Sequence, residues 1–434
     1  MVEESVAIGQ IGRIDVNIGL VLCSYLVTPR KFRGCGTASG RRRGGCEDRA
    51  MSRLRYLTAG ESHGQALVAI LEGLPAHLPV AVKDIADELS RRRAGYGRGP
   101  RMKIEKDALE IVSGVRGGET LGTPVGILIR NTEWDKWQHV MPVEGSPGGR
   151  ELTRPRPGHA DLAGMLKYDF DDARNVLERA SARETAARAA IGMLAKLLLG
   201  QIGISVISHV LSIGDARVPD DAPIPGAGDL EAIDASPTRC FHDPTSEAMV
   251  TAIEKAGAEG DSLGGVVELI AFGLPPGLGS HVHWDRKLDG RLAGALMSVP
   301  AIKGVEVGDG FRGAAVPGSQ AHDAIETDLG RATNRAGGTE GGMSIGGPLR
   351  LRAAMKPLST LKKRLRTVDM ATGEPAEAFQ ERTDVCAVPA AGVVCESVVA
   401  LTLADAVLEK FGGDTLDDLK GAHARYLERV RARP

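Results

Sequence analysis

The sequence predicts an α+β protein in which buried helices pack against strands, and two segments carry this prediction. In residues 349–355, apolar side chains alternate with others that include two arginines, which is typical of a strand with one buried face. Residues 181–199 are rich in alanine and leucine, which favours a tightly buried helix. The chain has 434 residues, 42% of them hydrophobic, enough for a large core in one domain or two.

Elements in the first half follow from apolar runs and from apolar residues spaced three or four apart. Short apolar runs predict strands, whereas Ile85 and Leu89 with flanking charges predict an amphipathic helix. We therefore expect strands at 54–58, 66–71, 110–115 and 124–131, a helix at 84–93, a Gly/Pro-rich loop at 134–150, and the buried helix at 181–199.

Elements in the second half follow in the same way. Prolines in 216–226 predict a surface connection, and three leucines four residues apart (Leu288, Leu292 and Leu296) share one helix face. We expect an exposed helix at 246–258, strands at 264–272 and 349–355, a buried helix at 392–411 closed by two glycines, and an amphipathic surface helix at 416–431.

Composition excludes several classes of protein. The formal net charge of −2 gives no support for general binding of nucleic acid. The six cysteines form no CxxC pair, so we expect no metal site and no disulfide framework, and a reducing cytoplasm is favoured. The first fifty residues contain a ten-residue apolar run, 18–27, too short to span a membrane and preceded by acidic rather than basic residues.

This N-terminal stretch differs from the rest of the chain. Apart from the apolar run, it holds the Arg41-Arg42-Arg43 cluster among glycines. We interpret residues 1–50 as a disordered or non-native extension with no function, and residues 51–434 as the main domain, with Met51 as a plausible alternative start.

A histidine between small residues draws attention to the segment Gly60-Glu61-Ser62-His63-Gly64, between two predicted strands. Histidine exchanges protons near neutral pH. A lone histidine at a strand end also fits a packing role. His63 alone therefore does not decide between proton transfer and packing. A second histidine, His159, follows a stiff basic segment with two prolines and makes a better site candidate.

Basic loops suited to anions recur along the chain. Residues 91–101 hold five arginines among glycines, which can either converge on an anion or form a solvated basic loop. Ser181 and Glu184 form a capping-box pattern at a helix start flanked by Arg179 and Arg183, a natural anion site or simply a well-capped helix.

A glycine-rich run lies near the C-terminal part of the chain. Residues 334–347 contain six glycines but neither a GxGxxG nor a Walker motif. A glycine run that leads into a strand can lie flat against a planar ligand. The strand that follows ends in Lys356-Pro357-Leu358-Ser359-Thr360, whose lysine and hydroxyls suit phosphate. Further on, Asp384 stands beside Arg382, where a plain ion pair is the alternative to a functional carboxylate.

Four motifs in this order resemble those of the chorismate synthases. They are residues 60–64, residues 179–184, the glycine-rich run leading into 356–360, and Arg382-Thr383-Asp384. The match runs from about Arg53 to the last predicted helix, so only the N-terminal stretch lies outside it.

The resemblance implies a function that the residues alone do not show. Chorismate synthases are lyases that convert 5-enolpyruvylshikimate 3-phosphate to chorismate and phosphate by a 1,4-anti elimination, the last step of the shikimate pathway of aromatic amino-acid biosynthesis. They need reduced FMN without net redox change. In the family, the flavin lends electron density as phosphate leaves and recovers it as carbon 6 loses a proton. The resemblance also implies a sandwich of helices between antiparallel sheets and a homotetramer.

The resemblance also implies roles for single residues. His63 matches the histidine that protonates the departing phosphate, His159 the one that serves the reduced flavin, and Asp384 the aspartate that assists flavin N5. Arg92 and Arg98 match basic substrate positions that are also described as NADP sites. Positions matching FMN contacts are Arg179, Ala180, Ser181, Pro300, Ala301, Gly341, Lys356, Pro357, Leu358, Ser359, Thr360 and Arg382.

Two positions depart from the family pattern. Ile345 stands where many members have asparagine, which removes an amide available to the flavin or the local backbone. Thr383 replaces a serine, a mild change.

Two other functions compete with this interpretation. The first is a bifunctional enzyme with its own NADPH-dependent flavin reductase activity. Because no dinucleotide fingerprint is present, we favour reduced FMN from an external reductase. The second is a non-catalytic protein that binds anions or RNA through the arginine loops, which would leave His63, His159 and Asp384 without a shared purpose.

Overall fold

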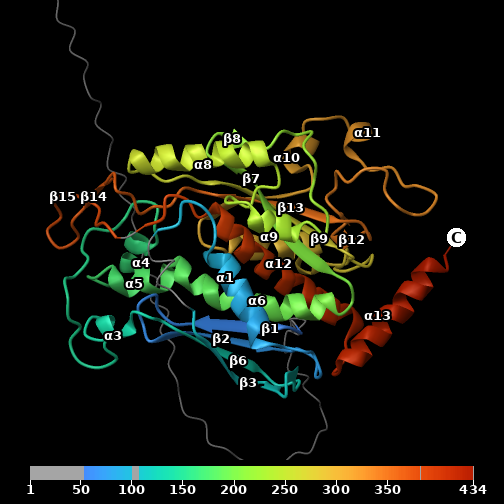
Figure 1. Ribbon diagram of the computed structural model, residues 1–434, viewed down its shortest axis with the longest axis horizontal. Helices are drawn as coiled ribbons and strands as arrows, with labels where there is room; N and C mark the ends of the chain where they lie inside the picture. Colours follow the sequence, from blue (N-terminus) through green and yellow to red (C-terminus); the bar gives the residue numbers. More distant parts are fainter. Residues whose placement is uncertain (1–52, 100–106, 382, 434) are drawn as a thin grey trace, which may run out of the picture. The chain divides into compact units, whose positions relative to one another are not determined.

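Figure 1 shows the computed structural model, which describes residues 53–99, 107–381 and 383–433. Its first sheet has four antiparallel strands in the order β1-β2-β6-β3. Their bounds are β1 Arg55–Ala59, β2 Ala66–Glu72, β6 Val125–Arg130 and β3 Leu109–Ser113. Side chains alternate along β2, so that Leu67, Ala69 and Leu71 are buried on one face.

The second sheet has five antiparallel strands in the order β10-β13-β9-β7-β8. Their bounds are β10 Ile302–Val307, β13 Leu349–Met355, β9 Gly265–Phe272, β7 Ser205–Ile213 and β8 Ala216–Arg217. Strand β13 alternates between buried and half-buried residues over its whole length, as the sequence predicted. The buried residues of β13 therefore share the face of the strand that points toward the interior.

Helices fill the space between the two sheets (Figure 1). They are α1 Val82–Arg93, α6 Thr185–Gly200, α9 Leu288–Met297 and α12 Val388–Phe411. Helix α6 packs against β2 and β6 of the first sheet, whereas α12 packs against α6 and against β7 and β9 of the second. The predicted sandwich of helices between antiparallel sheets is therefore confirmed, and one continuous apolar core joins both sheets.

The remaining elements lie outside this sandwich. The longer ones are α8 Asp243–Ala258, which contacts β7 and β8, and the C-terminal helix α13 Leu416–Arg431. Short helices are α3 Trp134–Trp137, α4 Asp161–Tyr168, α5 Arg174–Ala180, η1 Ala182–Glu184, α7 Leu230–Ala235, η2 Trp284–Arg286, α10 Gly310–Gly313 and α11 Gly318–Ala321. Small strand pairs are β4 Val115–Arg116 with β5 Glu119–Thr120, β11 Thr339–Glu340 with β12 Met343–Ser344, and β14 Arg366–Val368 with β15 Pro375–Glu377.

The predicted helices and strands occur in the structure with small differences. Helix α12 begins at Val388, earlier than predicted, because Pro389 fits the first turn of a helix, where no backbone donor is needed. The short helix α3 lies within the predicted loop 134–150. The capping box at Ser181 was wrong: Ser181 Oγ accepts from Arg183 N and starts the 3-10 turn η1, while the Glu184 carboxylate pairs with Arg188.

Helix α12 is also long and apolar enough, by length and composition, to cross a membrane. In this structure, 89% of its most apolar window is buried, and the helix packs between the two sheets. That environment is the one expected for the central helix of a core.

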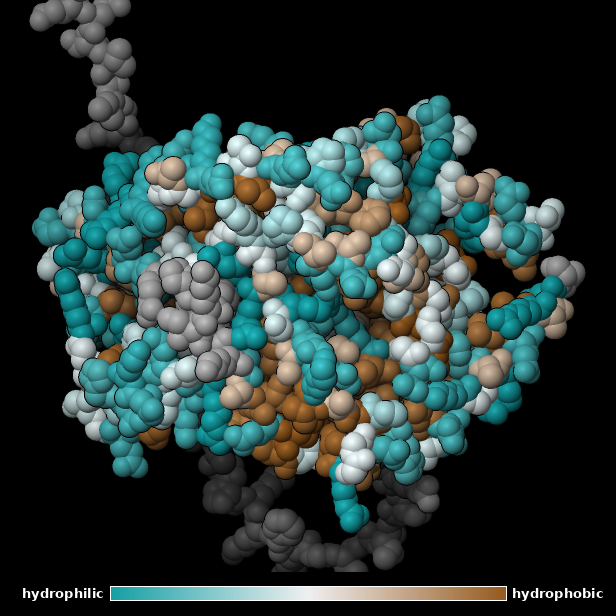
Figure 2. Space-filling model, in the orientation of Figure 1, coloured by the Kyte–Doolittle hydropathy of each residue, from teal (hydrophilic) through white to brown (hydrophobic). Residues whose placement is uncertain are grey.

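The face shown in Figure 2 is mostly polar, and its largest apolar area lies in the region of the four-stranded sheet. The side of this sheet that faces away from the helices exposes Leu57, Ile70 and Val112, at 72%, 41% and 64%. Ion pairs between Arg55 and Glu72 and between Arg130 and Glu110 lie at its margins.

Candidate active site

A cavity of about 490 Å³ collects most of the predicted site residues from loops at one end of the sandwich. This volume lies in the range of sites for small molecules and cofactors. Of the predicted residues, the following line it: His63, Arg92, Arg98, His159, Ala180, Ser181, Pro300, Ala301, Lys356, Leu358, Ser359, Thr360 and Asp384.

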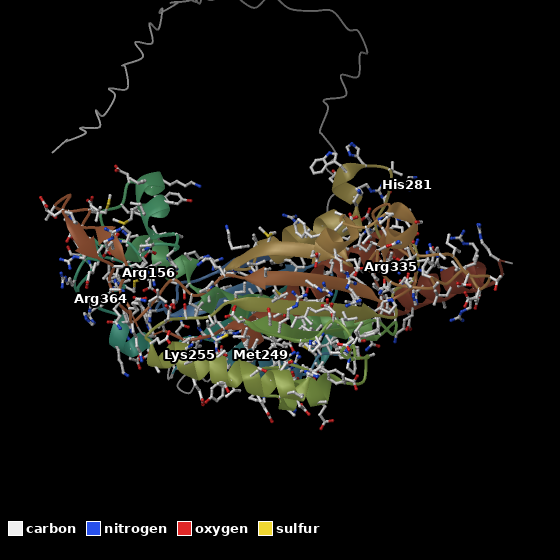
Figure 3. All side chains as sticks on the ribbon, turned by 90° about the horizontal axis from the view of Figure 1, so that it is seen from above. Arg156, Met249, Lys255, His281, Arg335 and Arg364 are labelled. Carbon is white, nitrogen blue, oxygen red and sulfur yellow. The ribbon has the colours of Figure 1, made fainter. Side chains whose placement is uncertain are left out.

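Three predicted residues do not line this cavity. Arg179 donates instead to the backbone oxygens of Thr58 and Gly60. Pro357 lies between two lining residues without contributing to the wall. Gly341 lies in the turn between β11 and β12, beside His281, and Figure 3 places His281 and the cavity residue Arg156 at opposite ends of the molecule. Arg382 lies outside the described residues.

The loop that carries His63 joins β1 to β2. Gly60 opens it with φ +103°, and an added Cβ would lie 2.3 Å from the carbonyl oxygen of Ala66, so only glycine fits. Asn131 donates to the backbone oxygens of Glu61 and Gly64, which holds the loop closed.

The imidazole of His63 is held by groups that the sequence analysis missed. Its Nδ1 lies 3.0 Å from each carboxylate oxygen of Glu178, on α5. Its ring stacks on Trp137, with the ring centroids 3.9 Å apart. Arg174 lies over the ring of Trp137 and approaches the Glu178 carboxylate at 3.4 Å. Glu178 precedes Ser181 by only three residues, but no sequence signal links it to His63.

His159 is held in a similar way by a carboxylate that is fully buried. Its Nδ1 contacts Asp161 Oδ1, and Arg156 donates to both oxygens of Asp161, from Nε at 2.8 Å and from Nη2 at 3.1 Å. Burial alone would raise the pKa of Asp161, but the hydrogen bonds from His159 and Arg156 outweigh it and hold the pKa at about 2. Asp161 is therefore a carboxylate, and it orients His159.

Asp384 forms an ion pair, as the alternative interpretation expected, but its partner is Arg98 at 2.9 Å. Its other oxygen accepts from the backbone N–H of Gly99 at 2.6 Å. Because both residues come from the predicted arginine loop, Asp384 positions that loop against the cavity.

Two buried arginines, Arg92 and Arg183, line the cavity together with His63. Arg183 donates to Asn131 and pairs with Asp107, which Arg92 also approaches at 4.0 Å. Ser181 Oγ donates to Ser62 Oγ at 3.2 Å, and both serines line the same cavity. The predicted anion site at this helix start therefore has Arg92 rather than Arg179 beside Arg183.

Lys356 lines the cavity directly after β13, which ends at Met355. It forms no ion pair with any described residue, and among these residues its ammonium donates a hydrogen bond only to the carbonyl oxygen of Pro357, at 3.4 Å. Burial and the nearby charge of Lys303 lower its pKa. Such a cation is suited to an anionic group of a ligand.

The cavity combines five cationic side chains with two histidines, each backed by a carboxylate. This arrangement can bind a small molecule with several negative charges and move protons on it. A second cavity of about 1310 Å³ adjoins it and shares Arg98, Gly99, Glu381, Thr383 and Asp384. These features define an enzyme that acts on an anionic small molecule.

Comparison with known proteins identifies the family. Residues 54–408 match the family model described as chorismate synthase. The chain is 60% identical over 392 residues to chorismate synthase of Thermobifida fusca, covering 88% of this chain and 100% of that protein. It is 56% identical over 395 residues to the Streptomyces coelicolor protein, again over 88% and 100%.

A solved structure agrees with this match. A crystal structure of chorismate synthase superposes with a TM-score of 0.71 at 42% identity, covering 88% of this chain and 99% of that one. The chain therefore belongs to the chorismate synthase family and is a lyase.

Proposed function

We propose that this chain catalyses the 1,4-anti elimination of phosphate from 5-enolpyruvylshikimate 3-phosphate to give chorismate, and that it needs reduced FMN to do so. The observation that carries the proposal is the convergence of His63, His159 and Asp384 on one cavity with an excess of cationic side chains. The substrate carries a phosphate and two carboxylates, which matches that charge.

The residues present fit a flavin phosphate. Lys356 has no carboxylate partner among the described residues, and the hydroxyls of Ser359 and Thr360 line the cavity close to it. Ala180, Ser181, Pro300, Ala301 and Leu358 would hold the remainder of the cofactor. When bound, reduced FMN supplies electron density transiently while phosphate leaves.

Each polar residue then has a task that its contacts support. His63 gives a proton to the departing phosphate, while Arg92 and Arg183 stabilise the negative charge there. His159 serves the flavin, oriented by Asp161. Asp384 assists the loss of the proton from carbon 6 and keeps Arg98 in the wall.

The source of reduced flavin is part of the proposal. Only 5% of the Arg92 side chain and 11% of the Arg98 side chain are exposed, and Arg98 is paired with Asp384. These contacts favour a substrate role over an NADPH site, so we propose a monofunctional enzyme supplied by an external reductase. Steady oxidation of NADPH by the pure protein with FMN would contradict this.

A homotetramer in the cytoplasm completes the proposal. The exposed apolar face of the four-stranded sheet supports self-association, and the described cysteines Cys240, Cys386 and Cys395 are free and buried, which suits a reducing compartment. Mass measurement in solution tests the tetramer, which requires a value near four times 45.7 kDa.

An anaerobic assay tests the function directly. Chorismate and phosphate should appear in equal amounts with dithionite-reduced FMN and neither should appear with oxidised FMN. His63→Ala and His159→Ala should each lower turnover by roughly 10²-fold or more. Lys255→Met, on the outer helix α8 (Figure 3), is the control and should retain full activity. Near-normal turnover of either histidine variant would contradict its assigned role.

A further inference from the structure

Glu178 makes an unusual set of contacts for a buried carboxylate. Only 1% of its side chain is exposed, yet its two oxygens lie 3.0 Å from Nδ1 of His63. One of them, Oε2, also accepts from the backbone N–H of His63 at 2.8 Å. The same carboxylate therefore fixes both the backbone and the ring of one residue.

The charge state of Glu178 follows from its surroundings. Burial alone would raise its pKa, but hydrogen bonds and charge from His63, together with Arg174 at 3.4 Å, outweigh burial and lower the pKa. An ionised carboxylate has no proton to donate and can only accept hydrogen bonds. Nδ1 of His63 must therefore carry a proton.

The protonation of the other ring nitrogen, Nε2, follows from this. With Nδ1–H committed to Glu178, Nε2 is the atom of the neutral ring that lacks a proton and can exchange one. The His63 side chain lines the cavity, and stacking on Trp137 hinders the ring from turning over. The contacts with Glu178 and Trp137 therefore favour one ring orientation, with a proton on Nδ1.

We propose that Glu178 is a positioning residue, which fixes the Nδ1–H tautomer of His63 so that Nε2 exchanges the proton with the ligand in the cavity. This inference rests on the proton-transfer role proposed above for His63. In the forward step, the Nε2–H bond of the protonated ring breaks and an O–H bond forms on the leaving phosphate. The ring keeps its Nδ1 proton, Glu178 keeps its charge, and solvent returns a proton to Nε2 before the next turnover.

Replacement of Glu178 by glutamine separates this role from simple packing. An amide has one accepting oxygen, but Glu178 receives two kinds of donor, the backbone N–H and Nδ1–H of His63. If the amide oxygen keeps the backbone contact, its NH₂ group faces Nδ1 and drives the proton to Nε2. Glu178→Gln should therefore favour the wrong tautomer with little change in shape.

The expected kinetic effect is a fall in kcat of roughly 10²- to 10⁴-fold, the range seen when an orienting carboxylate or a general acid is lost, with KM changed by less than about threefold. Glu178→Asp keeps the charge and both acceptor oxygens, so its kcat should be at least about tenfold higher than that of Glu178→Gln. Failure of Glu178→Asp to exceed Glu178→Gln would overturn the inference.

A matched control comes from a second histidine–carboxylate pair outside the cavity. Glu268 lies 3.2 Å from His209 in the second sheet, and both are buried. Glu268→Gln should lower thermal stability but leave kcat within about twofold of the wild-type value. A loss of kcat as large as that of Glu178→Gln would overturn the inference, because both variants would then act through stability.

The tautomer itself is measured by long-range ¹H–¹⁵N NMR on protein labelled at its ten histidines. The His63 signals are those absent from the His63→Ala spectrum. Nδ1–H in the wild type and a shift toward Nε2–H in Glu178→Gln support the inference, and Nε2–H in the wild type overturns it. An active His63→Ala enzyme would refute the proposed role of His63 independently of either tautomer result.

Discussion

Lys356 is a cation in the cavity whose charge no described carboxylate neutralises. Lys356→Met keeps the length of the side chain and removes the charge. Because no ion pair is lost, the melting temperature should stay within about 2 °C of the wild-type value. The dissociation constant for FMN should rise at least about tenfold, the loss expected for a charge-assisted contact to phosphate. Titration of FMN fluorescence measures this change.

The matched control is again Lys255→Met on α8, which should leave FMN affinity unchanged. Equal affinity in wild type and Lys356→Met would show that the flavin phosphate is bound elsewhere.

At the residue scale, the sequence revealed the side chains with intrinsic chemistry but not their partners. His63 and His159 stood out because they lie between small or rigid residues, and the structure brings both into one cavity. Glu178 did not stand out, since its partner His63 lies 115 positions away and ordinary helix sequence surrounds it. Such pairing depends on tertiary packing, which local patterns do not encode.

At the element scale, α6 and α12 are closely packed at Gly192. An added Cβ there would lie 2.3 Å from Cβ of Ser397 and 2.7 Å from its Cα. Gly192→Ala must push the two helices apart, so we expect it to lower the free energy of unfolding by about 1–3 kcal/mol, as overpacking does. Urea denaturation measures the change.

Gly200 supplies the control on the same helix. It is the last residue of α6, and an added Cβ would meet no atom within 4 Å. Gly200→Ala should leave the free energy of unfolding unchanged or raise it by up to about 1 kcal/mol, because alanine favours helix. A similar loss in both variants would argue against close packing at Gly192.

The same element shows why helix boundaries were harder to predict than helices. Alanine and leucine content predicted that α6 is buried, and it is. The Ser181 and Glu184 pattern also fits a capping box, but Glu184 pairs with Arg188 and the chain makes a 3-10 turn first. A local cap and a nearby ion pair compete at the start of this helix. Helix propensity alone therefore does not predict where the helix begins.

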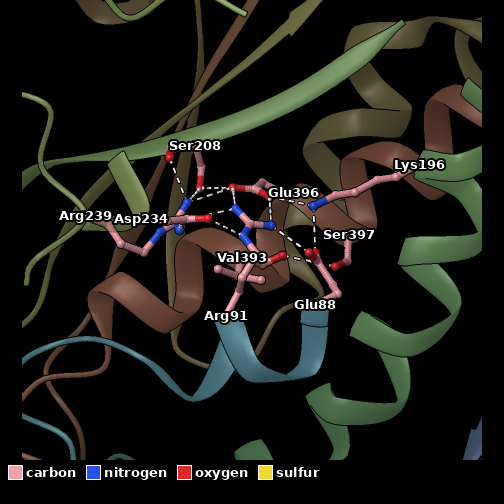
Figure 4. Close-up of polar contacts among 9 residues, drawn as sticks. All are labelled: Glu88, Arg91, Lys196, Ser208, Asp234, Arg239, Val393, Glu396 and Ser397. Atoms are coloured by element: carbon pink, nitrogen blue, oxygen red, sulfur yellow. Dashed lines mark hydrogen bonds and ion pairs between the residues drawn. The ribbon is translucent and has the colours of Figure 1, made fainter. Parts of the chain in front are cut away.

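At the scale of the whole molecule, one buried ionic network joins the inner helices to the second sheet (Figure 4). Glu396 on α12 is fully buried and contacts Arg91 at 3.0 Å and Lys196 at 2.5 Å. Arg239 also reaches it at 3.0 Å, and Ser208 on β7 donates to it at 2.6 Å. The cations hold the pKa of Glu396 far below its ordinary range despite burial.

Glu396→Gln should destabilise the fold strongly. It leaves Arg91, Lys196 and Arg239 with too little negative charge, and removing one partner of a buried ion pair costs about 3–5 kcal/mol. Glu409→Gln on the same helix removes a partly exposed partner of Arg286 and Arg291, and should cost at most about 1 kcal/mol. Urea denaturation compares the two, and equal losses would mean that burial of the network adds no stability.

Acid should destabilise the whole molecule within a defined range of pH. The pKa values of Asp161 and Glu268 lie at about 2 in the folded chain, below the values of 3.8 and 4.5 expected when unfolded. A depressed carboxyl pKa stabilises the fold above the unfolded value, and this stabilisation is lost as pH falls through the folded value. Each group should therefore contribute about 2–3 kcal/mol, lost between about pH 4.5 and pH 2.

Urea denaturation at a series of pH values measures this loss. Glu268→Gln carries no titrating group at that position, so its free energy of unfolding should fall less steeply with acid than that of the wild type. The difference in slope reports the contribution of Glu268, and the remaining slope includes that of Asp161. A wild-type stability that stays constant between pH 4.5 and pH 2 would contradict the pKa values and the hydrogen bonds that cause them.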